Sequence, residues 1–289
     1  MPLDVAIYAI AGHRRSTVCT QAMYSGIKAV GDRPRLLVEA DYREPLHDIA
    51  VFYGYTATLQ RVMADYIAAG RKAVYIDLGY WHREGLHGHH KISLNGRHPT
   101  AYFQKRPHRF DRAAKAGVTI EPWRATGRHI LLAGMGEKAA NAEGLPVEKW
   151  ERDAVAWLSR ISDRPITYRP KPSWLQAREI PGTRFSWGGT VPRLGYHREF
   201  LHDVLRDCHA IVTHHSNVAV EAICAGVPAF AWKGVAVPMA SQDIDAIETP
   251  AMPEGREQWA ADIAYTQWNV AEMQAGLPWR NFKDEGLIS

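Results

Sequence analysis

The sequence predicts an α/β protein built from two Rossmann-like domains that face a central cleft. Short apolar runs alternate with helical patterns from residue 4 to residue 77, and the alternation resumes at residue 128. This alternation is typical of parallel sheets whose strands are joined by helices. Moreover, each cluster of polar or basic side chains follows directly after a predicted strand, which is where open α/β sheets bind ligands.

The first domain is predicted over residues 1–125. Its strands are apolar runs with β-branched or aromatic residues, expected at 4–10, 35–39, 49–53 and 72–77. Its two helices, 17–30 and 57–69, each end at a glycine. Residues 79–127 are rich in Gly, His, Arg and Pro, so we interpret them as a loop-rich insertion at the end of this domain.

The second domain is predicted over residues 126–289. Strands are expected at 128–133, 165–169, 210–213 and 229–232. Helices are expected at 147–161, after Ser216 and near 256–274. The last of these would carry Trp268, and it is expected either to pack within this domain or to cross back to the first.

Composition limits the kind of ligand and compartment. The chain has 289 residues, a formal net charge of +4 and 14 histidines. This mild basicity favours an acidic ligand such as a nucleotide diphosphate, a phosphorylated glycan or nucleic acid. No apolar run is long enough to span a membrane and the start lacks the features of a signal peptide. Three widely spaced cysteines indicate free thiols in a reducing cytoplasm, Cys19, Cys208 and Cys224.

The stretch 211–230 is the most informative part of the chain. Two imidazoles, His214 and His215, follow a buried strand, and Ser216 or Asn217 can cap the helix that begins there. Free amide groups at a helix start, beside imidazoles, favour binding of an anion. Glu221 lies one turn into the helix, where it can accept hydrogen bonds from a sugar or ribose.

These residues resemble the C-terminal domain of GT-B-type glycosyltransferases. The shared pattern is Ser-Asn-x-x-x-Glu-Ala-x-x-x-Gly-x-Pro, which spans residues 216–228. The resemblance implies that the helix start faces the diphosphate of a nucleotide sugar and that Glu221 faces the ribose of the nucleotide. It also implies that the two predicted domains form a GT-B-like pair.

Two further segments extend the predicted donor site. Residues 134–138, Gly-Met-Gly-Glu-Lys, follow a strand and are interpreted as a diphosphate loop. Residues 169–172, Arg-Pro-Lys-Pro, resemble a segment of GT-B transferases that build polymers, and their cations would grip phosphate. The predicted donor-binding residues are Gly134, Gly136, Lys138, Arg169, Lys171, His214, His215, Ser216, Asn217 and Glu221.

The first domain is predicted to supply the acceptor surface and the catalytic base. The candidate catalytic residues are Asp77, His82 and His13, each after a predicted strand, where a carboxylate or imidazole can take a proton from an acceptor hydroxyl. The candidate acceptor-binding residues are Gly12, Arg14, Arg15, Tyr80, Trp81 and Arg83.

No metal and no cofactor are predicted beyond a nucleotide sugar, a UDP- or GDP-sugar, as co-substrate. Four histidines crowd the insertion, at 87, 89, 90 and 98, but their spacing matches no known ligand motif. Fixed cations and helix-start amides can stabilise a leaving nucleotide diphosphate. Transfer is therefore expected to be metal-independent.

The resulting hypothesis is a glycosyltransferase that moves a hexosyl or pentosyl group. The chain is similar to uncharacterised transferases of bacteriophages and proteobacteria. That resemblance implies a hydroxymethylated pyrimidine in phage DNA as acceptor and the host cytoplasm as location. Three alternatives stay open: a transferase acting on a surface or lipid-linked polysaccharide, an enzyme like the UDP-N-acetylglucosamine 2-epimerases, and a non-enzymatic nucleotide- or DNA-binding protein.

Overall fold

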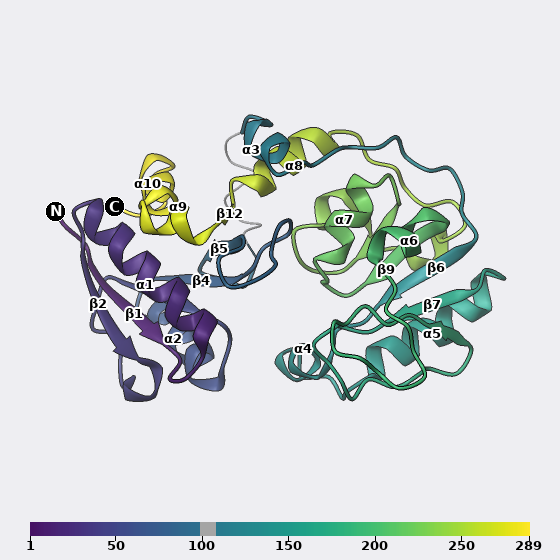
Figure 1. The fold of residues 1–289 in the computed structure, drawn as a ribbon, viewed down its shortest axis with the longest axis horizontal. Coiled ribbons are helices and arrows are strands. Elements are labelled where there is room, and N and C mark those ends of the chain that lie inside the picture. Colours follow the sequence, from purple (N-terminus) through teal and green to yellow (C-terminus); the bar gives the residue numbers. More distant parts are fainter. Residues whose placement is uncertain (99–107) are drawn as a thin grey trace. The chain divides into compact units, whose positions relative to one another are not determined.

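The chain folds into two compact α/β units, each built on one six-stranded sheet (Figure 1). The structure is a computed structural model that describes residues 1–98 and 108–289. The first unit combines Met1–Arg112 with Ala261–Ser289, and the second unit is Ala113–Ala260. The chain therefore passes from one unit to the other twice, within α3 (Asp111–Lys115) and within α8 (Arg256–Ala264).

The sheet of the first unit has the order β12-β5-β4-β3-β1-β2. Strands β1 to β4 are parallel, whereas β5 runs antiparallel to β4 and β12 antiparallel to β5. The strands are β1 (Asp4–Ala9), β2 (Arg33–Val38), β3 (Ile49–Tyr53), β4 (Lys72–Leu78), β5 (His90–Leu94) and β12 (Gln267–Trp268). The helices are α1 (Arg14–Ala29), η1 (Glu39–Asp41), α2 (Ala57–Ala68), α9 (Val270–Gln274) and α10 (Leu277–Asp284).

The apolar pattern of the first half explains these elements. All five residues of β3 are buried, as expected for a strand covered on both faces. Thr56 accepts a hydrogen bond from the backbone amide of Leu59 and so caps α2. The buried side of α2 carries Leu59, Val62, Met63 and Tyr66, which pack in one core cluster with β1, β3 and β4.

The C-terminal segment is an integral part of the first unit. Helix α9 packs along α1, and both α9 and α10 lie beside it in Figure 1. The approach is so close that a Cβ atom at Gly26 of α1 would lie 2.0 Å from the carbonyl oxygen of Met273. The buried carboxylate of Asp32 accepts hydrogen bonds from the indole of Trp279 at 2.7 Å and from the amide of Leu3 at 2.9 Å. The sequence-based boundary at 125/126 therefore differs from the division observed at 112/113 and 260/261.

The sheet of the second unit is parallel throughout, with the order β11-β10-β9-β6-β7-β8. Its strands are β6 (His129–Ala133), β7 (Ile166–Arg169), β8 (Thr183–Phe185), β9 (Cys208–Thr213), β10 (Ala229–Ala231) and β11 (Ala240–Ser241). Its helices are α4 (Glu137–Ala142), α5 (Lys149–Ile161), α6 (Leu201–Arg206), α7 (Val218–Cys224), η4 (Val237–Met239) and η5 (Ile244–Ala246).

The loop-rich region 79–127 also contains regular elements, since β5 and the whole of α3 lie within it. One expectation about the elements was wrong. The single helix expected near 256–274 is broken into α8, β12 and α9, so that Trp268 lies in a strand. Asn269 starts α9 with a capping box in which it exchanges hydrogen bonds with Glu272, and this new helix start interrupts the predicted helix.

Among the helices that the structure describes, none combines the length and the apolar character needed to cross a membrane.

Candidate functional site

The second unit carries its polar clusters at the point where its sheet reverses direction. From β6 the chain builds the sheet toward β8, and from β9 it builds toward β11, so β6 and β9 are neighbours at the switch. Ligands of open α/β sheets bind outside the carboxyl ends of strands at such a point. Here the hydroxyl of Thr213 donates to the carbonyl of Ala133 at 3.0 Å and accepts from the amide of Ser216 at 3.1 Å. These bonds link the ends of β9 and β6.

The two predicted histidines lie together at this edge. The Nδ1 atoms of His214 and His215 are 2.7 Å apart and their rings are nearly perpendicular. The ring of His214 also meets the edge of Trp150, with centroids 5.9 Å apart. Its carbonyl accepts from the amide of Lys233 at 2.9 Å, which connects the end of β9 to the segment after β10. The pair is therefore held by packing and backbone contacts, and both rings stay partly exposed.

The start of α7 follows directly. Asn217 occupies the cap position without a side-chain cap bond, while the hydroxyl of Ser216 accepts from the amide of Val218 at 3.3 Å. Glu221 lies in the first turn and is half-buried. Its negative charge favours the charged form of Arg169, so the two side chains interact electrostatically.

Arg169, at the end of β7, is a buried cation with fixed partners. Its side chain donates to the hydroxyl of Ser186 at 2.8 Å and to the carbonyl of Glu199 at 3.0 Å. Burial lowers the pKa of the guanidinium, whereas the carboxylates of Glu199 and Glu221 oppose this shift. The residue is 8% exposed, so it supplies a stationary positive charge and also anchors the segment after β8.

The glycine loop after β6, residues 134–138, already binds a carboxylate from elsewhere in the protein. The carboxylate of Glu151 on α5 accepts from the amide of Met135 at 2.8 Å and from the backbone of Gly136. Burial raises the pKa of Glu151. Of the predicted residues here, Gly134 is buried, Gly136 lies against the stem of Lys171, and Lys138 is exposed. Sequence reasoning missed Glu151, because its position on a later helix leaves no local signal.

In the first unit, the corresponding switch lies between β1 and β3. Gly12 forms the turn after β1, and His13 caps α1 by accepting the amide of Ser16 at its Nδ1 atom, at 3.1 Å. The ring of His13 lies 5.6 Å from the ring of Tyr53 at the end of β3. Arg14 and Arg15 form the first turn of α1 rather than the loop that precedes it.

His90 joins this cluster and was not predicted as part of it. It pairs with Leu78 at the start of β5, is fully buried, and its ring lies 5.8 Å from that of Tyr53. Burial, and next the charge of Arg15, lower the pKa of His90 to about 4. The apolar-polar alternation of residues 90–94 was the signal that could have revealed this strand.

Asp77, at the end of β4, lies in the same neighbourhood. Its carboxylate accepts from the hydroxyl of Tyr75 at 2.9 Å and from the amide of Leu78 at 2.8 Å. Burial, and next the charge of Asp77, raise the pKa of Tyr53 to about 12. Asp77, Tyr53, His90 and Arg15 therefore form one electrostatically coupled group at the carboxyl end of this sheet.

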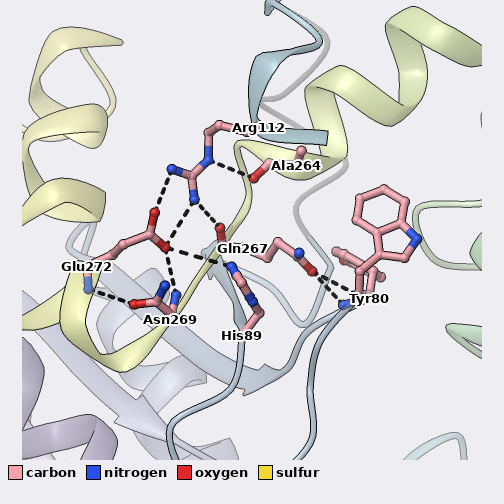
Figure 2. Close-up of polar contacts among 8 residues, drawn as sticks. Tyr80, His89, Arg112, Ala264, Gln267, Asn269 and Glu272 are labelled. Carbon is pink, nitrogen blue, oxygen red and sulfur yellow. Dashed lines mark hydrogen bonds and ion pairs between the residues drawn. The ribbon is translucent and has the colours of Figure 1, made fainter. Parts of the chain in front are cut away.

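The loop after β4 is fixed by the C-terminal segment. The side-chain oxygen of Gln267 accepts from the amides of Tyr80, at 2.7 Å, and of Trp81, at 3.1 Å. Figure 2 shows Gln267 directed toward Tyr80. The ring of Tyr80 is fully buried, whereas Trp81 is partly exposed. Arg83 donates to the carbonyl of Tyr80 at 2.9 Å, and His82 is exposed with a left-handed backbone. Of the two aromatic side chains predicted to meet the acceptor, Trp81 is thus the accessible one.

Arg112 ties the same segment together (Figure 2). It donates to the carboxylate of Glu272 at 2.8 and 3.2 Å, to the carbonyl of Gln267 at 2.9 Å and to the carbonyl of Ala264 at 3.2 Å. Its guanidinium also lies 3.9 Å from the ring centroid of Trp268. The guanidinium of Arg112 thus donates to backbone carbonyls at the break between α8 and α9. These bonds explain why β12 can form there.

The predicted donor residues all lie in the second unit, and the predicted catalytic and acceptor residues all lie in the first. Within the second unit, the structure brings the His214–Glu221 segment, Arg169 and the glycine loop to adjacent strand ends. Within the first unit, it gathers His13, Arg15 and Asp77, whereas the segment 80–83 is a separate loop beside Gln267.

Comparisons with known proteins address the fold. No protein-family model and no curated protein sequence matches this chain. Among solved structures, the β-Kdo 2,4 transferase of KpsC from Thermosulfurimonas dismutans aligns with a TM-score of 0.55 at 11% identity, covering 93% of this chain and 92% of that one. The β-Kdo 2,7 transferase of the same KpsC aligns with a TM-score of 0.52 at 12% identity, covering 96% and 99%.

A UDP-GlcNAc 2-epimerase from Methanocaldococcus jannaschii aligns over 98% of this chain and 100% of its own, at 11% identity. Its TM-score of 0.33 is too low to support a conclusion about function. The two KpsC transferases, by contrast, align with TM-scores above 0.5, and at identities this low the likeness concerns the fold alone. The predicted fold class is confirmed: the chain has the GT-B-type architecture of two Rossmann-like α/β units.

Proposed function

We propose that this chain is a glycosyltransferase that takes a sugar from a nucleotide-sugar donor. The donor would bind in the second unit, outside the carboxyl ends of β6 and β9. The observation that carries this proposal is the position of Glu221, the His214–His215 pair and the fixed cation of Arg169 around the switch point of that sheet. The fold shared with two Kdo transferases supports the same reaction class.

The charges of this site suit the bond changes of sugar transfer. The bond between the anomeric carbon and a phosphate oxygen breaks, and negative charge develops on the leaving nucleotide. Arg169 is a preorganised positive charge, and the exposed ammonium of Lys171 follows it on the same segment. Glu221 would accept hydrogen bonds from ribose hydroxyls, since its carboxylate is half-buried at the same edge.

The first unit would bind the acceptor and remove its proton. His13 is poorly suited as the base, because its Nδ1 accepts from Ser16 and the neutral ring then carries its proton on Nε2. His13 would instead donate a hydrogen bond to the acceptor. Asp77 is the better base, since its carboxylate can take a proton and is oriented by the bonds from Tyr75 and Leu78. His82, exposed on the loop, is the third candidate.

For the acceptor, we propose a saccharide hydroxyl. Its support is that the two KpsC neighbours, with TM-scores of 0.55 and 0.52, are named as Kdo transferases. A hydroxymethylated pyrimidine in phage DNA is the second candidate, supported by the net charge of +4. An epimerase would need no acceptor, so the reaction itself separates it from a transferase.

The test is a transfer assay with the full chain. A panel of UDP-, GDP- and activated Kdo donors is combined with oligosaccharides, with plain duplex DNA and with hydroxymethylated duplex DNA. The proposal expects donor consumption that depends on an acceptor and yields a glycosylated product. Modified DNA as the only acceptor would move the proposal to its second candidate. Epimerised donor without an acceptor, or no donor turnover at all, would contradict glycosyl transfer.

A further inference from the structure

A second kind of site lies at the edge of the His214–His215 pair. Within residues 1–98 and 108–289, one group of three side chains, Glu143, His214 and His215, places a potential metal-ligand atom of each within 4.8 Å of the others. Glu143 ends α4, whereas the histidines follow β9, so the group exists only in the folded unit.

The carboxylate of Glu143 is largely buried and therefore needs a positive charge close to it. Its side chain is 7% exposed, and a carboxylate so buried is costly unless a positive charge compensates it. At present the ammonium of Lys233 forms an ion pair with it. The side chain of Lys233 is 54% exposed, so it can rotate into solvent, and another cation can then bind in its position.

The two histidines are close to the geometry of a chelating pair. Their Nδ1 atoms are 2.7 Å apart, which is the distance of a hydrogen bond. Tetrahedral zinc with Zn–N bonds of about 2.0–2.1 Å needs a separation of about 3.3 Å. The rings would therefore open by about 0.6 Å, a shift that small side-chain rotations supply. During this shift, the ring contact with Trp150 and the backbone hydrogen bond from Lys233 keep His214 in position.

We propose that Glu143, His214 and His215 form a binding site for a zinc-type transition metal ion, with one coordination position left for a ligand from outside the protein. Two imidazoles and one carboxylate suit zinc, whereas magnesium and calcium prefer oxygen ligands throughout. The site departs from the sequence expectation of a chain without a metal. It does not rest on glycosyl transfer, since metal binding can be measured with no sugar present.

The first experiment needs only the wild-type chain. Chelator-stripped full-length protein is titrated with Zn²⁺ against a chromophoric chelator, and with Co²⁺ while its visible spectrum is recorded. The proposal expects one equivalent of zinc, no competition from excess Mg²⁺, and Co²⁺ bands typical of nitrogen and oxygen ligands. Absence of stoichiometric binding would overturn it. So would a thiolate-to-cobalt band, which would place the metal at one of the three cysteines instead.

Variants locate the metal. His215→Ala and Glu143→Gln are each expected to weaken zinc binding by more than about 10-fold, the lower end of what even outer-shell partners contribute. His202→Ala, an exposed histidine of the same unit, is the matched control and should bind as the wild type does. Lys233→Gln removes the competing ammonium and should tighten binding. Undiminished zinc affinity in folded His215→Ala and Glu143→Gln, or weaker binding in Lys233→Gln, would overturn the assignment.

Discussion

Arg169 shows how one buried cation can join separate segments of a unit. Its guanidinium joins Ser186 and the carbonyl of Glu199, two partners that a shorter, single-headed cation cannot reach together. We expect Arg169→Lys to lower the free energy of unfolding by about 2 kcal/mol, as for loss of one hydrogen bond to a charged group. Urea denaturation measures this loss. Arg178→Lys, at an exposed position, is the control, and an equal effect in both variants would contradict the buried role.

His90 makes a prediction about pH. Burial, and next Arg15, lower its pKa to about 4, below the ordinary 6.5, so the folded state favours the neutral ring. The stabilisation is complete above pH 6.5 and is lost as the pH falls toward 4. Between pH 6.5 and 5 the loss should amount to about 2 kcal/mol. His90→Gln should lack this component, so urea denaturation of both proteins at the two pH values isolates it. Parallel losses in both proteins would contradict the assignment.

Single residues were predicted best where chemistry is local in the chain. The segment 214–221 follows β9 as the turn and capping residues indicate, and Arg169 ends its strand as expected. Partners from distant elements left no such signal. The glycine loop was interpreted as a diphosphate loop, but Glu151 from α5 already accepts two of its backbone amides. Which amides are free depends on packing, and a single sequence does not display it.

At the scale of elements, the ends of two helices provide a matched test of close packing. Gly226 after α7 and Gly70 after α2 both adopt a left-handed backbone, with φ of 74° and 70°. A Cβ atom at Gly226 would lie 2.0 Å from the carbonyl oxygen of Pro122, whereas one at Gly70 would meet nothing within 4 Å. Gly70→Ala should therefore cost about 1–2 kcal/mol of stability from backbone strain alone.

Gly226→Ala should cost about 3 kcal/mol or more, because the overlap with the backbone of Pro122 adds to the same strain. Thermal and urea denaturation of the two variants gives the comparison. Equal costs would mean that the segment before β6 can move away from α7 without penalty.

The elements that the sequence missed share a physical cause. Strand β5 is short, has only a brief alternation of its own and lies between turn residues, and its pairing with β4 fixes it as a strand. Strand β12 has two residues and depends on β5 in the same way. Long apolar runs, by contrast, form β1, β3 and β4 close to the predicted bounds, since burial on both faces dictates their composition. The local sequence pattern predicts strands whose apolar composition follows from burial on both faces. It misses strands that form because they pair with a neighbouring strand.

At the scale of the whole molecule, the first unit depends on both ends of the chain. The carboxylate of Asp32 is 1% exposed and bonds to Trp279 and Lys283 of the C-terminal segment. Burial alone would raise its pKa, but hydrogen bonds from Lys283, Trp279 and the amide of Leu3 hold it below the ordinary value. This anchor belongs to the first unit, which combines the start of the chain with its last residues.

Asp32→Asn should lower the stability of the first unit by about 3 kcal/mol, as for removal of one partner of a buried ion pair. Hydrogen exchange should then become faster in Met1–Arg112 and Ala261–Ser289 together, but not in Ala113–Ala260. Asp4→Asn breaks an exposed pair with Arg33 and is the control, with an expected effect below about 1 kcal/mol. Faster exchange confined to the C-terminal segment would contradict its place in the first unit.

The central claim is that a nucleotide sugar binds outside the carboxyl ends of β6 and β9, and its most direct test is calorimetric titration of the full chain with the donor panel. Glu221→Gln keeps the shape of the side chain but removes its charge, and should weaken donor binding by about 10-fold or more, as for loss of a charged hydrogen bond. Glu257→Gln, an exposed carboxylate at the start of α8, should bind as the wild type does. Donor binding that is equally tight in Glu221→Gln, or absent from the wild type with every donor, would contradict the account.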